Sequence, residues 1–368
     1  MKKRFMKILL SAAAATTLAL GLTACSEEGN GVGEYDHLVT FNYNIGTLDA
    51  NCPDQYLGVM TNSLVGIQPG YSDAFKFQEV IGYYNEGWYL AEVDGEGNPV
   101  KDEDGRVQLG EKWDFATDRV TENVTLYANM LAKPALVIKG GDSDVKFDGI
   151  PGDIRREPSS ALMPKKAGAT FYGYFEDEAC TQPFSFPYTF EEGGKTVYAK
   201  FIEGIWTIVD TAEEFKLALS GNKNIYVDAD IDFSEDGWMK GASYSGEIDG
   251  NGKKFTGISC SFAATQSERT GFGMFGTLED TAYVHDLTIE NATATFSTSF
   301  ALVDLKAALF AHTVEEGAKL ENVTVTGSIS LGTLILGADV ILYGAIAIDG
   351  GAIIENCNFT GIIVDSGV

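Results

Sequence analysis

A six-residue pattern recurs in the C-terminal half of the chain. Its copies Val284–Ile289, Leu320–Val325 and Ile354–Phe359 start 36 and 34 residues apart, and Phe255–Cys260 has the same pattern 29 residues before Val284. Each copy has apolar residues at its first, fourth and sixth positions and two small or polar residues between the first two of these. Repeats of 20 to 50 residues are typical of units that bury a shared core only by stacking. A stacked β structure is therefore predicted.

The pattern also predicts where its residues point. We expect the apolar positions to form buried ladders, with Cys260, Ile289, Val323 and Cys357 among the core residues. The third position of each copy is expected at a turn, where Asx side chains hydrogen-bond to the backbone and tolerate left-handed conformations. This position holds the predicted structural ladder of Asp286, Asn322 and Asn356.

A short helix is predicted before these repeats. Thr211 is a candidate N-cap with Glu214 three residues later, which is a capping box, and Gly221 would end the helix. The segment Gly246–Ile258, with its Asp-Gly-Asn-Gly-Lys run, resembles the opening of pectin-lyase-like proteins. The apolar and glycine-bearing runs before each copy are similar to GLUG-type repeats. These resemblances imply a right-handed parallel β-helix over residues 205–368 with a short N-terminal capping helix.

The preceding region contains alternating segments typical of half-buried strands. Strand segments at Val39–Asn44, Gly87–Tyr89 and Val124–Ala128 occur in that order, with a Trp-Asp-Phe turn at Trp113–Phe115 before the last. The series resembles the internalin-type B repeat, and a second, degenerate copy closes at Thr196–Phe201. The resemblance implies small β-grasp-like modules at residues 35–131 and 132–204, with the aromatic residues in their cores and no catalytic residues. The fold class expected for the whole chain is mainly β.

The first copy contains an acidic insertion, Asp94 to Arg106. It lacks the ligand spacing of an EF-hand loop, so a calcium site is not expected there. Glycine, asparagine and proline between two valine-bearing segments favour a solvent-exposed hairpin.

The N-terminus has the pattern of a secretion signal. Four cationic residues precede an apolar stretch from Ile8 to Leu20, and Leu22-Thr23-Ala24-Cys25 resembles the lipobox of bacterial lipoproteins. The resemblance implies that residues 1–24 are a signal peptide and that Cys25 is lipidated, which would attach the chain to a membrane. Residues 25–34 are rich in glycine, polar and acidic residues and are expected to form a flexible tether. The expected location is the cell envelope, at the cell surface, on either the outer face of an outer membrane or a Gram-positive membrane.

Charge argues against two classes of partner. The formal net charge is −27, and removal of the four N-terminal cations leaves about −31. Such a surface repels nucleic acid and anionic lipid headgroups, so no nucleic-acid partner is expected.

The four cysteines after Cys25 are widely spaced and form no CxxC pair; they are Cys52, Cys180, Cys260 and Cys357. This spacing favours isolated thiols over zinc ligands or a disulfide framework.

Catalysis is not expected from the pattern of charged residues. The acids Asp228, Asp230, Asp232 and Asp249 are expected in the first turns of the β-helix with no histidine or arginine beside them, and His285 is expected to be a solvated turn residue. We therefore expect no enzyme activity, no catalytic residues, no cofactor and no metal.

The predicted function is a non-catalytic surface adhesin or binding protein for a host protein or glycan. The alternative is a carbohydrate-active β-helix protein, a polysaccharide lyase, a glycosidase or a glycan-capture component. An uncapped last repeat at residues 361–368 leaves open whether a partner covers it.

Overall fold

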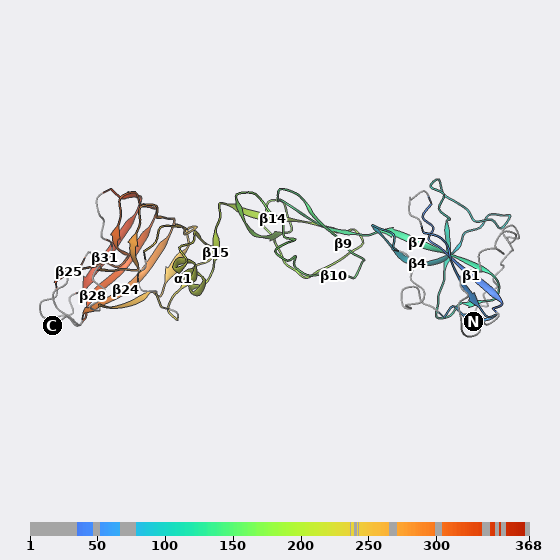
Figure 1. The fold of residues 1–368 in the computed structure, drawn as a ribbon, viewed down its shortest axis with the longest axis horizontal. Helices are drawn as coiled ribbons and strands as arrows, with labels where there is room; N and C mark the ends of the chain where they lie inside the picture. The colour runs from blue at the N-terminus through green and yellow to red at the C-terminus, as the bar shows by residue number, and fades with distance from the viewer. Residues whose placement is uncertain are drawn as a thin grey trace, which may run out of the picture. The chain divides into compact units, whose positions relative to one another are not determined.

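The computed structural model describes residues 35–46, 52–66, 79–235, 237–238, 241, 243–264, 271–298, 304–332, 339–342, 346 and 351–364. Within these residues the chain forms strands and one α-helix, which confirms the mainly β class (Figure 1). The chain divides into two compact units. The first unit comprises Met1–Pro164 and Tyr174–Tyr198, and the second comprises Lys165–Gly173 and Ala199–Val368. The predicted signal peptide, Cys25 and the tether lie outside the described residues.

The first five-stranded sheet has the order β2-β1-β7-β4-β5. Its strands are β1 (His37–Asn42), β2 (Gln55–Val59), β4 (Tyr83–Ala91), β5 (Leu109–Lys112) and β7 (Val124–Ala132), and a separate pair joins β3 (Ser63–Leu64) to β6 (Arg119–Val120). Strand β1 pairs in parallel with β7 and antiparallel with β2. The alternating residues Val39, Phe41 and Leu126 are buried, and Phe41 meets Trp88 edge to face at 5.0 Å between ring centroids. Alternation therefore predicted the inward side of these strands correctly.

The second five-stranded sheet has the order β12-β11-β14-β8-β9. Its strands are β8 (Ala135–Lys139), β9 (Val145–Asp148), β11 (Ala169–Phe175), β12 (Pro183–Phe184) and β14 (Lys195–Glu203), and a separate pair joins β10 (Ile154–Arg155) to β13 (Tyr188–Thr189). Here too the first strand, β8, pairs antiparallel with its successor β9 and in parallel with the last long strand β14. Read from the other edge, the order repeats that of the first sheet. The two regions thus share a strand order despite their weak sequence similarity.

The insertion Asp94 to Arg106 forms two short loops instead of one hairpin. One is closed by the bridge between Val93 and Pro99, and the other by the bridge between Lys101 and Val107. In each loop the first aspartate, Asp94 or Asp102, accepts hydrogen bonds at 2.9–3.0 Å from backbone N–H groups two and four residues later. The side chain of each aspartate therefore closes its own turn, so the single hairpin was the wrong prediction.

The helix predicted at the start of the second unit is confirmed. It is α1 (Ala212–Ser220), and Thr211 is its N-cap, with the side chain accepting a hydrogen bond from the backbone N–H of Glu214 at 3.3 Å. Glu214 reaches back to the backbone N–H of Asp210 at 3.2 Å. The buried side of the helix presents Phe215, which packs 5.6 Å from Trp238. The cap thus holds one end of an element that contributes directly to the core.

Replacing Thr211 by alanine should lower the free energy of unfolding of the second unit by about 0.5–2 kcal/mol, because the N–H of Glu214 loses its acceptor. Urea denaturation followed by tryptophan fluorescence measures the change. Glu213→Gln, on the same exposed turn, is the matched control and should change stability by less than about 0.5 kcal/mol. Equal effects of the two substitutions would contradict the capping role.

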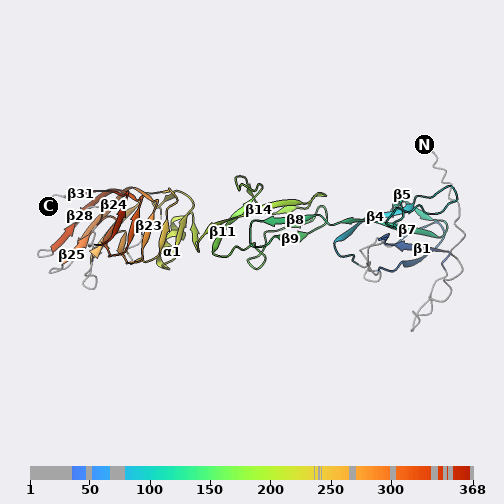
Figure 2. The ribbon, with the colours of Figure 1, turned by 90° about the horizontal axis from the view of Figure 1, so that it is seen from above.

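From residue 205 onward, the strands of the second unit form parallel sheets. Every strand pair recorded in them is parallel. Two of the sheets have six strands: one has the order β15-β16-β18-β23-β27-β30, and the other has the order β17-β19-β24-β28-β31 with β20 also paired with β24. The smaller sheets are β21-β25-β29 and β22-β26. Figure 2 shows β24 and β28, which are paired in parallel, side by side in this unit.

Most strands of these sheets are short, and β24 and β28 are the longest. They are β15 (Thr207–Val209), β16 (Ile225–Val227), β17 (Ile231–Asp232), β18 (Glu247–Asp249), β19 (Lys254–Thr256), β20 (Ser259–Ala264), β21 (Gly271–Phe272), β22 (Phe275–Leu278), β23 (Tyr283–His285), β24 (Thr288–Thr298), β25 (Asp304–Ala307), β26 (Ala311–Val314), β27 (Lys319–Glu321), β28 (Thr324–Leu331), β29 (Asp339–Leu342), β30 (Ile353–Glu355) and β31 (Asn358–Val364). The right-handed β-helix and the domain limits remain predictions.

The buried ladders follow the six-residue pattern. Val284 pairs with Leu320, Leu320 pairs with Ile354, and Ile289 pairs with Val325. Val284, Leu320, Ile289 and Val325 are fully buried. The predicted core thiols lie at the expected positions, with Cys260 buried and Cys357 partly buried, and both are free. The inward positions of the repeat were therefore predicted correctly.

The register of the earliest copy was predicted wrongly. Val284 pairs with Ile248 instead of Phe255, and Phe255 pairs with Ile289. The reason is turn length: four residues separate β18 from β19, whereas two separate β23 from β24. The strands of the two neighbouring layers still pair with each other. Because the turn after β18 is longer, the six-residue pattern of that layer is out of line with the pattern of the next layer.

Candidate functional site

The outer side of the β18-β23-β27 ladder carries two rows of polar and aromatic side chains. Side chains alternate across a strand, so the residues on either side of the buried Ile248, Val284 and Leu320 point away from the core. We call these outward residues the polar face. Its first row is Glu247, Tyr283 and Lys319, and its second row is Asp249, His285 and Glu321, each paired in register with the next.

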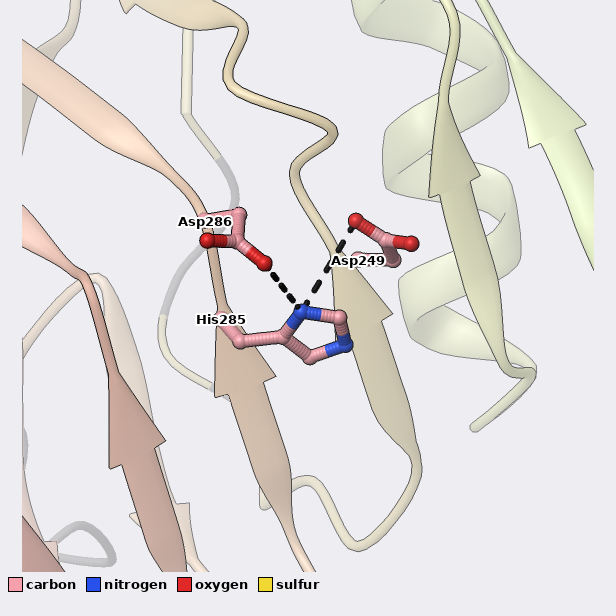
Figure 3. Close-up of side chains that lie close together, drawn as sticks. All are labelled: Asp249, His285 and Asp286. Carbon is pink, nitrogen blue, oxygen red and sulfur yellow. Dashed lines mark hydrogen bonds and ion pairs between the residues drawn. The ribbon is translucent and has the colours of Figure 1, made fainter. Parts of the chain in front are cut away.

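His285 is the centre of the polar face (Figure 3). Its Nδ1 lies 2.8 Å from Oδ2 of Asp286 and 3.8 Å from Oδ1 of Asp249, and its Nε2 lies 3.3 Å from Oε1 of Glu247. The imidazole is stacked on the ring of Tyr283, with centroids 4.3 Å apart, and its side chain is only 13 % exposed. Neighbouring contacts therefore define the orientation of the ring, with carboxylates at both nitrogens.

Asp286 begins the turn after β23 and has a left-handed backbone, with φ of 53°. Asn322 and Asn356 occupy the same position in the next layers, with φ of 53° and 54°. The amide of Asn322 donates a hydrogen bond at 2.8 Å to Oδ1 of Asp286. Hydrogen bonding to His285, and secondarily to Asn322, holds the pKa of the Asp286 carboxyl below its ordinary value. The predicted ladder residues thus lie at turns, and one of them reaches the candidate site.

Lys319 is neutralised by carboxylates of its own strand and of the next. Its Nζ lies 2.7 Å from Oε2 of Glu321 and 3.8 Å from a carboxylate oxygen of Glu355. The hydroxyl of Tyr283 donates to Glu321 at 2.6 Å, and Lys319 lies 4.7 Å from the centre of the Tyr283 ring. The hydrogen bond from Lys319 is the main reason that the pKa of Glu321 is lowered. This cation therefore does not balance the carboxylates around His285.

The expectation that no histidine accompanies the acids was wrong for Asp249. His285 lies in strand β23, not at a turn, and it is the parallel-paired neighbour of Asp249. The two are 36 residues apart, which equals the spacing between the copies that start at Val284 and Leu320. Aligning Ile248 with Val284 would have found the pair in the sequence.

The other three acids of that group have structural contacts. Asp228 accepts a hydrogen bond from the hydroxyl of Tyr172 at 2.7 Å, an interaction that raises the pKa of Tyr172 to about 12. Asp230 accepts from the backbone N–H of Lys254 at 2.9 Å. Asp232 accepts from the N–H of Ser234 at 2.9 Å. Their carboxylates are therefore occupied in holding adjacent segments.

A cavity of about 580 Å³ lies in the first unit, at the end of β1 and beside the acidic loops. Asn42, Asn44, Cys52 and Tyr127 are among its lining residues. Both amide atoms of Asn44 are bonded to the backbone of Val107, and burial raises the pKa of the Cys52 thiol. A protonated thiol is a weak nucleophile, so the cavity offers polar walls without an activated group.

Two curated proteins resemble part of the chain. A "Putative Gly-rich membrane protein" of Evansella cellulosilytica is 25% identical over 130 residues, which are 35% of this chain and 13% of that protein. A "Putative membrane protein" of the same organism is 25% identical over 139 residues, which are 38% of this chain and 18% of that protein. The chain thus spans less than a fifth of the length of these relatives.

No protein-family model matches the chain, and no solved structure matches it. The names of the two relatives agree coarsely with a membrane-associated or envelope location. Among the described residues, no helix has the length and apolar character needed to cross a membrane.

Proposed function

We propose that this chain is a lipid-anchored, non-catalytic surface protein that binds a host protein or glycan. In this proposal Cys25 carries the lipid and residues 25–34 form a tether. Two β-grasp-like modules then carry a right-handed parallel β-helix, which holds the recognition surface. The two relatives named as membrane proteins support the envelope location.

The polar face is the observation that carries the binding role. Its side chains project from three strands in register, and the buried ladder beneath them consists of Ile248, Val284 and Leu320. Sites built on regular strands hold side chains more precisely than sites on loops. An aromatic ring, Tyr283, beside the acids Glu247 and Asp249 offers a combination of apolar contact and hydrogen-bond acceptors. Because the chain is strongly acidic, neutral or basic ligands are favoured over anionic polymers.

Replacing Cys25 by serine should release the protein from the membrane fraction, because the hydroxyl cannot replace the thiol that carries the lipid in the lipobox resemblance. Fractionation and labelling of intact cells with a membrane-impermeant reagent measure anchoring and exposure together. Cys180→Ser is the control and should stay membrane-bound. Retention of Cys25→Ser in the membrane would contradict lipid anchoring.

A second experiment distinguishes binding from catalysis. The full chain is applied to a glycan array and to immobilised host extracellular proteins, and is also incubated with the polysaccharides that it binds. We expect retention without depolymerisation, and weaker retention when Tyr283 is replaced by alanine. Release of shortened oligosaccharides would overturn the non-catalytic proposal and favour the carbohydrate-active alternative.

A further inference from the structure

We propose that Asp249, His285 and Asp286 form a binding site for one divalent transition-metal ion of the Zn²⁺ type. The inference rests on the geometry of the second unit and does not depend on the proposed binding of a protein or glycan. The site would use Nδ1 of His285 and one oxygen from each aspartate, and the next coordination position would face solvent.

The three ligand atoms already lie close enough together. All of them are within 4.8 Å of one another, and Nδ1 is 2.8 Å and 3.8 Å from the two carboxylate oxygens. A tetrahedral ion with bonds of about 2.0–2.1 Å separates its ligand atoms by about 3.3 Å. The two distances from Nδ1 bracket that value, so a change of about 0.5 Å in each would match these two separations. Figure 3 shows both carboxylates on the Nδ1 side of the ring.

The outer contacts fix this arrangement. Glu247 lies at the opposite nitrogen, where it can accept the Nε2 proton and leave the Nδ1 lone pair for a metal ion, as in carboxylate-histidine-zinc arrangements. Asn322 holds the Oδ1 of Asp286, and the backbone N–H of Asn251 donates to Asp249 at 2.8 Å. The ligands are thus positioned from three neighbouring layers before any ion binds.

Charge provides a separate reason for a cation. Three carboxylates, Glu247, Asp249 and Asp286, surround one imidazole, and in the part of the chain that the structure describes their ion pairs run to His285 alone. A lone pair that faces two anionic oxygens is repulsive unless a proton or a metal ion lies between them. The competing explanation is a hydrogen bond in which the Nδ1–H of His285 donates to Asp286, and the experiment must distinguish the two.

The donor set selects the kind of ion. Calcium takes six to eight oxygen ligands and magnesium keeps most of its water, so neither is matched by one nitrogen and two carboxylates. Imidazole with carboxylate suits zinc, nickel and other first-row ions. Asp286 is 44 % exposed, so a ligand from solution can reach the ion.

Titration of the EDTA-treated full chain with ZnCl₂ in a calorimeter tests the proposal. We expect saturable binding that Glu247→Gln, which removes the outer partner of the imidazole, weakens by about 10–100-fold and that His285→Gln and Asp249→Asn each weaken by more. Glu290→Gln, whose carboxylate pairs with Lys254 outside the polar face, is the control and should bind as the original chain does. Circular dichroism of each variant establishes that it is folded, and Co²⁺ absorbance reports the coordination.

Three results would overturn the proposal. The first is the absence of Zn²⁺ binding by the folded original chain, which would leave the hydrogen bond between His285 and Asp286 as the explanation. The second is undiminished binding by His285→Gln, which would place the ion at other residues. The third is stronger binding of CaCl₂ than of ZnCl₂. Each result leaves the proposed protein or glycan binding unaffected, because that is measured on arrays with EDTA present as well as absent.

Discussion

Replacing Phe255 by alanine should lower the free energy of unfolding of the second unit by about 3–5 kcal/mol, the range for deletion of a fully buried aromatic ring. The Phe255 side chain is fully buried. Its ring centroid lies 4.8 Å from that of Phe215 and 5.2 Å from that of Phe233, so it joins the capping helix to the first parallel layers. Alanine leaves a cavity that these neighbouring rings can fill only by leaving their own contacts.

Urea denaturation monitored by tryptophan fluorescence measures this loss, because Trp238 lies 6.4 Å from Phe255. Leu217→Ala is the matched control: it removes an apolar side chain from α1 that is 72% exposed, and it should cost less than about 0.5 kcal/mol. If both substitutions had similar effects, Phe255 would not be the centre of a rigid core. A loss confined to the fluorescence of Trp88 and Trp113 would assign the change to the first unit and also contradict the prediction.

Replacing Gly250 by alanine should cost about 1–3 kcal/mol or more, because the added methyl group overpacks two stacked layers. A Cβ at this position would lie 2.5 Å from the carbonyl oxygen of Asp286 and 2.7 Å from Cα of Leu287. Both are backbone atoms, and the N–H of Gly250 already donates to the carbonyl of His285 at 2.8 Å. The layers cannot separate without breaking that bond.

Thermal unfolding followed by circular dichroism measures the effect of Gly250→Ala. Gly193→Ala serves as the control, because nothing lies within 4 Å of the methyl group that it adds and its backbone is not left-handed. We expect the control to differ from the original chain by less than about 0.5 kcal/mol. An unchanged melting temperature for Gly250→Ala would show that the turns after β18 and β23 are not in close contact.

Much of the fold was predictable because its signals are local. The alternation around Val39 and Leu126 and the repeat around Val284 and Leu320 each mark the inward side of a strand, since burial follows a period of two residues. Thr211 was predictable as a cap because only its own helix end is involved. The paired aspartate loops were not predicted, because a glycine-rich acidic segment is compatible with one hairpin or with two Asx turns.

The candidate site was predicted only in part. Asp286 was expected at a turn and lies at one, with a left-handed backbone. The partners of His285 were missed, because Glu247 and Asp249 are more than 35 residues away and an alignment by hydrophobic pattern placed Phe255 opposite Val284. The shared strand order of the two five-stranded sheets was likewise visible only in the pairing.

The sequence pattern thus predicted which residues face the core, where the helix begins and that a repeat recurs about every 35 residues. Which strands pair, and in which register, is visible only in the folded chain. Apolar residues at several positions can fill the same buried ladder, so the register also depends on the lengths of the connecting turns. The four-residue turn after β18 places Asp249, and not Thr256, beside His285.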